Sequence, residues 1–232
     1  GNYSYFGHTT AELTLRTGWV AVLVCSAVGG VAGGLFAAVL IRAARGFPGW
    51  LGRAIRWQPV LFAGLCGLVV AGVGILSRGE TYGTGYAQAR SAVEGHADLV
   101  TAYPLLKLVA NIASYLSGIP GGIFAPSLAV GATLGHVLSH SLAAPAGAVV
   151  LLGMAAYFSG VVQAPITATV IVMEMTDNQT IVVPLMATAF LAFVVSRLVC
   201  PRPLYSTLAD RLLTPAERAA EQAAKAAAEE GL

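Results

Sequence analysis

The sequence predicts an all-α membrane protein, a polytopic bundle of tilted and broken helices. Of its 232 residues, 56% are hydrophobic and only 10% are charged, and the mean hydropathy is +0.75. A soluble domain carries about 25% charged residues, so this chain cannot cover a water-facing surface of its size. Glycines and prolines divide the apolar residues into separate runs. The net charge of +2 is too small to indicate a nucleic-acid partner.

The first third of the chain predicts two spanning helices joined by a basic loop. Residues 1–16 are polar and turn-like, and we expect them to be the remnant of an extracellular loop. Residues 17–41 are apolar and long enough to cross a bilayer of about 30 Å. Four arginines without an acid follow at 42–56, so the positive-inside rule predicts a cytoplasmic loop. Residues 60–76 would then run back across the membrane.

Two pairs of glycines lie four residues apart in the first apolar run. Gly29 and Gly33 share one helix face, and so do Gly30 and Gly34. Such spacing allows another backbone to approach closely, although a helix also tolerates glycine without any contact.

The remaining apolar runs are shorter and predict partial helices. "YGTGY" in the polar stretch 77–99 is a candidate start for a short helix at a membrane edge. Further on, we expect helices at 100–116, 123–138, 147–161, 165–175 and 180–199, and a short one beginning at Tyr205. Three of these runs have 11 to 16 residues, too few for a plain span. Broken helices are tolerated in a membrane only beside protein or a water-filled cavity, so they indicate a transport site.

The last residues and the cysteines suggest no further domain or site. Residues 214–232 are rich in Ala, Glu and Lys and are predicted to be a polar cytoplasmic tail, which leaves 17–213 as the membrane domain. Cys25, Cys66 and Cys200 all lie in apolar runs, so they indicate neither disulfides nor a metal site.

The stretch 117–126, "SGIPGGIFAP", breaks the backbone between two apolar runs. Pro120 and the following glycines stop one helix, and Ile123 can start another. The first N–H groups of a helix lack intrahelical acceptors and carry about half a positive charge, so they can bind an anion without a lysine. A full positive charge would hold the anion too tightly for conduction. A Gly-Pro hinge between packed helices is the alternative.

A second candidate donor is the hydroxyl of Tyr205. It follows Pro203 in "PRPLYS", in a weakly hydrophobic setting at a predicted helix start. A phenol is a neutral donor suited to a halide. An aromatic residue at the membrane interface is the alternative interpretation.

Together these stretches resemble the second half of the CLC family of chloride channels and chloride/proton exchangers. "GIPGGIFAPSLAVGATLG" resembles the family's GGxFxPxLxxGA motif. "MEMTDN" at 173–178 resembles the segment that follows it, and "PRPLYS" at 201–206 resembles the terminal tyrosine motif. The three occur in family order over nearly the whole chain.

The resemblance implies the second half of an inverted-repeat fold and a chloride site where broken helices converge. It implies that the backbone amides of Ile123 and Phe124 and the hydroxyl of Tyr205 contact the central chloride. The family's Gly-Ser-Gly-Ile-Pro and Gly-x-Glu-Gly-Pro motifs, which supply an anion-binding serine and a gating glutamate, are absent. Ser117 precedes GGIFAP directly, so we do not assign it the anion role. We therefore expect a half-transporter.

The leading hypothesis for function is chloride transport across a membrane, by the C-terminal half of a CLC protein. The expected partners are chloride as the bound substrate, a first-half CLC segment, the lipid bilayer and a second copy through about 165–198. We expect a prokaryotic inner or plasma membrane, a cytoplasmic C-terminus and no cofactor. Whether the whole protein is a channel or an exchanger stays open.

The alternative is a non-conducting structural half-subunit that needs a first-half partner. We find no serine–lysine, paired-aspartate or HExxH arrangement, so we expect no catalytic residue and no enzyme.

Other polar residues in apolar runs have plainer interpretations. Lys107 is expected to pair or snorkel rather than bind anions. Glu174 is expected to make a structural hydrogen bond near a helix end. His136 and His140 share a helix face, but no carboxylate or cysteine is near them in sequence, so we expect no metal site.

Overall fold

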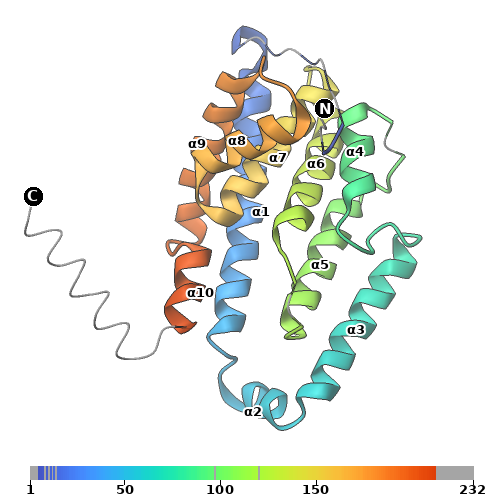
Figure 1. Cartoon of the computed structure of the whole chain (residues 1–232), viewed down its shortest axis with the longest axis vertical. Coiled ribbons are helices and arrows are strands. Elements are labelled where there is room, and N and C mark those ends of the chain that lie inside the picture. The colour runs from blue at the N-terminus through green and yellow to red at the C-terminus, as the bar shows by residue number, and fades with distance from the viewer. Residues whose placement is uncertain are drawn as a thin grey trace, which may run out of the picture.

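A computed structural model describes residues 5–7, 9, 11, 13, 15–96, 98–119 and 121–212. This part of the chain forms ten α-helices and no β-strand (Figure 1). The helices follow one another as α1 (Leu15–Ala44), α2 (Gly49–Trp57), α3 (Pro59–Leu76), α4 (Tyr86–Glu94), α5 (Tyr103–Leu116), α6 (Phe124–Ser139), α7 (Ala146–Val162), α8 (Pro165–Thr176), α9 (Val182–Val199) and α10 (Leu204–Leu212). The all-α prediction is confirmed.

Nine of these helices match the predicted segments closely. The exception is α2, because the basic stretch 42–56 was predicted as a loop and contains a nine-residue helix. Pro48 precedes α2 and Pro59 begins α3, so the two prolines set the ends of this short helix. In Figure 1, α2 lies at one end of the bundle and connects α1 to α3. The predicted tail 214–232 lies outside the described residues.

The centre of the bundle is α7, which is apolar on all sides. Every residue from Ala148 to Val161 is buried. A helix that is hydrophobic all round belongs inside a protein, and α7 packs against α1, α6 and α9. At 17 residues it is shorter than the roughly 20 residues of a plain membrane span.

The paired glycines of α1 are contact points with two different helices. A Cβ atom added to Gly29 would lie 2.6 Å from the Ala156 side chain of α7, and one added to Gly33 would lie 2.6 Å from the Tyr157 carbonyl oxygen. The second pair faces α9, where a Cβ on Gly30 would lie 2.7 Å from the Ala192 carbonyl oxygen. The prediction of close backbone approach is therefore confirmed.

A third close contact fixes α6, the helix that follows the broken stretch. A Cβ atom on Gly131 of α6 would lie 2.8 Å from the Gly153 carbonyl oxygen of α7. Reciprocally, a Cβ on Gly153 would lie 2.6 Å from the Gly131 carbonyl oxygen. The two backbones therefore touch, and the middle of α6 is packed directly on the central helix.

The amino-terminal residues pack against the far end of α8. The Phe6 side chain is buried, and its backbone N–H donates to the Met175 carbonyl at 2.9 Å. Asn178 donates from Nδ2 to the Thr9 carbonyl at 2.8 Å. The described residues of segment 1–16 are thus anchored to the bundle, which a loop remnant need not be.

Three helices are long and apolar enough to cross a membrane: Gly18–Ala44, Pro59–Leu76 and Val182–Val199. Large apolar side chains are exposed along each of them, as expected for surfaces that face lipid or another protein segment. The protein is therefore a multi-pass membrane protein.

Candidate functional site

The stretch 117–126 breaks the path between α5 and α6, as the sequence predicts. Ser117 ends α5, donating from Oγ to the Ser114 carbonyl at 2.7 Å and accepting the Ile119 N–H at 3.4 Å. Gly118 has φ +77°, a left-handed conformation that favours glycine. The chain therefore turns at Gly118 and enters α6 from a new direction.

The amino terminus of α6 has no side-chain cap. Its N-cap residue is Ile123, which has no side-chain oxygen to accept a backbone N–H. Among the described residues, no acceptor is found for the N–H groups of Ile123, Phe124 and Ala125. Helix ends without a cap are satisfied by water or by a ligand, so α6 offers free donors at this point.

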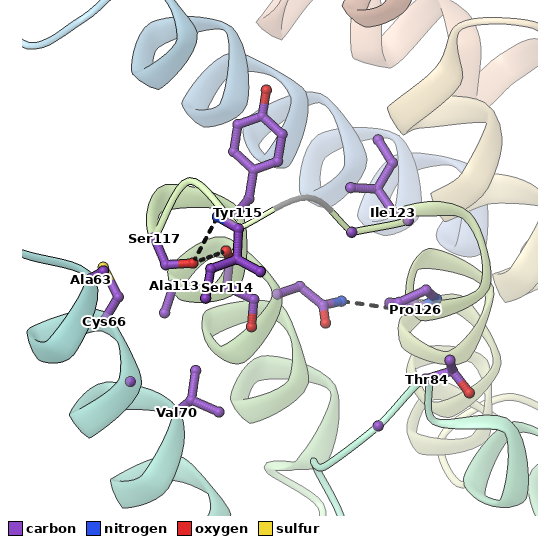
Figure 2. A pocket seen from close by; sticks show the side chains of 16 residues that line it. Ala63, Cys66, Val70, Thr84, Ala113, Ser114, Tyr115, Ser117, Ile123 and Pro126 are labelled. Carbon is purple, nitrogen blue, oxygen red and sulfur yellow. Dashed lines mark hydrogen bonds between the residues drawn. The ribbon is translucent and has the colours of Figure 1, made fainter. Parts of the chain in front are cut away.

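The N-cap residue of α6, Ile123, borders a cavity of about 450 Å³ between α3, α5 and α6. Gly121, Gly122 and Ile123 line it, and a Cβ added to either glycine would meet nothing within 4 Å. In Figure 2, Ser117 and Ile123 lie on either side of the broken stretch, and Cys66 and Val70 of α3 lie opposite. None of its lining residues is charged.

Several polar groups of this cavity were not anticipated from the sequence. Asn111 and Ser114 of α5 and Thr84 line it, and Asn111 donates from Nδ2 to the Pro126 carbonyl at 3.5 Å (Figure 2). The sequence did carry a signal for Asn111, because it is an amide side chain inside an apolar helix, four residues after Lys107.

A second cavity, of about 530 Å³, lies on the α2 side of the same stretch. Its lining includes Phe47, Arg56 and Gly118. Both cavities are lined by Tyr115, Ile119 and Gly121, so the broken stretch separates two spaces within the protein.

The three predicted anion-binding residues occupy different positions around this region. Ile123 lines the first cavity, whereas the Phe124 ring packs edge-on against Phe158 of α7 at 4.4 Å between centroids. Tyr205 lines neither cavity, and its side chain is 42% exposed. Leu204, the residue before it, is buried in the apolar cluster against which Ile123 also packs. Thus α6 and α10 begin beside one cluster, and the shared chloride site stays a prediction.

Lys107 shapes the first cavity without lining it. Its side chain is 1% exposed, and Nζ donates to the carbonyls of Thr81 and Gly83 at 2.7 Å each. These bonds hold the segment that carries Gly83 and Thr84 against α5. Lys107 therefore pairs with backbone rather than with an acid, and it does not point to bulk water.

Replacing Lys107 by methionine should destabilise the fold, because the carbonyls of Thr81 and Gly83 would lose charge-assisted hydrogen bonds. Such bonds contribute roughly 1.5–3 kcal/mol each, so we expect a loss of about 3 kcal/mol in the free energy of unfolding. Thermal unfolding in detergent measures it. Lys107→Arg keeps the charge, so its free energy of unfolding should fall much less. A methionine variant as stable as the wild type would contradict this role of Lys107.

The structure also places Glu174 and the histidine pair, the other polar residues considered in the sequence analysis. Glu174 is exposed, and no hydrogen bond from it is found among the described residues, so its expected structural role is not seen; Asn178 makes the bonds at this helix end. His136 and His140 do lie together, with ring centroids 4.9 Å apart. No group of three or more metal-ligating side chains occurs in the described part of the chain.

Residues 1–197 match the sequence profile of the family described as voltage gated chloride channel. The H(+)/Cl(−) exchange transporter ClcA of Yersinia pestis bv. Antiqua (strain Angola) is 30% identical over 223 residues, which cover 90% of this chain and 45% of that protein. The transporter of the same name from Salmonella paratyphi B (strain ATCC BAA-1250 / SPB7) is 32% identical over 227 residues, covering 93% of this chain and 46% of that protein. The chain thus spans about half the length of these relatives.

Two solved structures have a similar fold. A CLC-type fluoride/proton antiporter superposes with a TM-score of 0.71 at 25% identity, over 84% of this chain and 48% of that one. A slow cyanobacterial Cl−/H+ antiporter superposes with a TM-score of 0.58 at 22% identity, over 88% of this chain and 49% of that one.

Proposed function

Since the chain belongs to the voltage gated chloride channel family, we propose that it forms the C-terminal half of the membrane domain of a chloride transporter, with the chloride bound at the amino terminus of α6. The observation that supports this most is the uncapped start of α6, which opens on a cavity without charged lining.

The chemistry of such a site follows from its donors. The N–H groups of Ile123 and Phe124 are the free donors at the positive end of the α6 macrodipole. Gly121 and Gly122 leave space for an ion at the backbone. With no lysine or arginine in the lining, the anion is held by neutral donors and can leave again, as transport requires. The Tyr205 hydroxyl would supply a further neutral donor from α10.

We further propose that the whole protein exchanges chloride for protons, because two relatives at 30% and 32% identity are named H(+)/Cl(−) exchange transporters. The fluoride/proton antiporter among the similar structures makes fluoride the competing anion. The C-terminus would then face the cytoplasm of a prokaryotic cell, on the same side as the arginines of α2.

Liposomes can test transport directly. When the chain is reconstituted together with a first-half CLC segment, an outward chloride gradient should drive proton uptake, and chloride should be preferred to fluoride. The chain by itself should give no selective flux, because the donors of α6 would face an open cavity rather than a closed site. Chloride flux without coupled proton movement would indicate a channel.

The alternative, a non-conducting structural half-subunit, predicts the same assembly with no anion flux at all. Selective chloride flux from the purified 232-residue chain without any other segment would contradict the half-transporter hypothesis. Two measurements distinguish the hypotheses, because co-purification reports assembly and anion flux reports transport.

We also propose a homodimer through about 165–198. One face of α9 is buried against α1 and α7, and the opposite face exposes large apolar side chains, including Phe190. Cysteine at Phe190 should crosslink between subunits under oxidation. Cysteine at Val31 of α1 is a matched control, since Val31 and Phe190 are 41% and 42% exposed. Crosslinking from Val31 alone would count against this interface.

A further inference from the structure

A basic cavity lies where α1 and α9 end together, away from the broken stretch. Its volume is about 310 Å³, and it is lined by Ala38, Ile41, Arg42, Arg45, Val199, Cys200, Pro201 and Arg202. Three of these residues are arginines, and none is acidic. Arg42 lies in the last turn of α1, Arg45 directly follows the end of that helix, and Arg202 lies in the segment between α9 and α10.

In the part of the chain that the structure describes, the three arginines form no ion pair that would neutralise their charge. All three, Arg42, Arg45 and Arg202, are exposed. Guanidinium groups bind phosphate and carboxylate oxygens with two parallel hydrogen bonds. Three of them around one cavity therefore suit a ligand with a phosphate group better than a monatomic halide.

The cavity is held in shape by hydrogen bonds beneath it. Gln163 donates from Nε2 to the Cys200 carbonyl at 2.6 Å, and the Cys200 N–H donates to the Ser196 carbonyl at 2.7 Å. The Cys200 thiol lies 3.4 Å from the Arg202 carbonyl oxygen. The segment that carries Arg202 is thus positioned before any ligand arrives, which lowers the entropic cost of binding.

The surface that leads to the cavity is apolar. Leu35, Val39 and Arg42 follow one another at helical spacing on one face of α1, and the first two are exposed. Leu198, near the end of α9, is 81% exposed. The helices α1 and α9 pack closely here, because a Cβ atom added to Gly34 would lie 3.2 Å from the Ser196 carbonyl oxygen. An apolar surface that ends in three arginines matches an amphiphile with an anionic head.

We propose that this cavity binds the headgroup of an anionic phospholipid whose acyl chains lie along the exposed face of α1. The helix α1 is long and apolar enough to cross a membrane, and Leu35 and Val39, on the same face as Arg42, are exposed there. Basic pockets at the ends of membrane helices bind anionic headgroups in this way, at about 1 kcal/mol per arginine. The proposal requires only the membrane placement of α1 and does not depend on chloride transport.

Native mass spectrometry of the assembled protein in detergent tests it, with phosphatidylglycerol and phosphatidylcholine of identical acyl chains as probes. The wild-type protein should retain phosphatidylglycerol in preference to phosphatidylcholine. Changing Arg42, Arg45 and Arg202 to glutamine should weaken phosphatidylglycerol binding about fivefold per arginine and about a hundredfold together. Phosphatidylcholine binding should not change.

The matched control removes the same charge elsewhere. The triple variant of Arg53, Arg56 and Arg78 to glutamine should retain the preference for phosphatidylglycerol, because none of these residues lines the cavity. Lysine at the three cavity positions keeps the charge and should retain most of the binding.

Three results would overturn the proposal. One is an unchanged lipid preference in the variant with glutamine at the three cavity positions. Another is complete displacement of the lipid by inorganic phosphate, which would identify a soluble anion as the ligand. The last is loss of the dimer with unchanged lipid binding in the same variant, which would identify a second copy as the occupant.

Discussion

Replacing Gly33 by alanine is expected to push α1 away from α7 and destabilise the whole bundle. The added Cβ would lie 2.6 Å from the Tyr157 carbonyl oxygen and 2.8 Å from the Gly160 carbonyl carbon, and both are backbone atoms. Backbone cannot give way as the end of a flexible side chain can. Overpacking costs about 1–3 kcal/mol, and leucine at the same position should cost more than alanine.

Gly72 of α3 provides the matched control. It also lies in a long apolar helix, but a Cβ added there would meet nothing within 4 Å. Gly72→Ala should leave the free energy of unfolding unchanged or raise it by up to about 1 kcal/mol through helix propensity. Unfolding in detergent measures both variants. Equal midpoints for Gly33→Ala and the wild type would show that the α1–α7 contact is looser than described.

The second large effect is expected at Tyr205, in the assembled protein. Tyr205→Phe removes only the hydroxyl. Because a hydrogen bond to a charged partner contributes roughly 1.5–3 kcal/mol, the dissociation constant for chloride should rise about tenfold to a hundredfold. Burial raises the pKa of the Tyr205 phenol above its ordinary value of about 10. The hydroxyl is therefore protonated and can donate throughout the neutral range, and its contribution should not depend on pH there.

Three comparisons make the Tyr205 experiment specific. Tyr205→Ala also removes the ring and should weaken coupling between chloride and protons as well as binding. Substituting Phe124 should do less, because its proposed donor is a backbone N–H. Tyr82→Phe is the control, since Tyr82 is 51% exposed and lines neither cavity. Chloride affinity by calorimetry that is unchanged in Tyr205→Ala would remove Tyr205 from the site.

The fold was largely predictable because its helix boundaries are marked by proline and glycine. Pro59, Pro165 and the glycines before Phe124 stand at or near helix starts in the structure, as they do in the sequence. The glycine pairs of α1 correctly predicted close contacts, but not that each pair touches a different helix. That assignment depends on tertiary packing. The helix α2 was missed because its many arginines and glycines give no apolar run of helical length.

The candidate site was predictable only in part. The uncapped start of α6 follows from "GGIFAP", because none of these residues can cap a helix with a side-chain oxygen. The contribution of Asn111 was not predictable, since it depends on a contact with Pro126, 15 positions away. The same holds for the segment held by Lys107, whose hydrogen bonds join residues 24 and 26 positions apart. The basic cavity of Arg42, Arg45 and Arg202 joins residues about 160 positions apart.

Anomalous diffraction from crystals of the assembled protein grown in bromide tests the central claim most directly. We expect one strong bromide peak within hydrogen-bonding distance of the Ile123 and Phe124 backbone nitrogens and of the Tyr205 hydroxyl, at a position for which chloride competes. A well-ordered α6 with no peak at its amino terminus, or with bromide only beside arginine side chains, would contradict it.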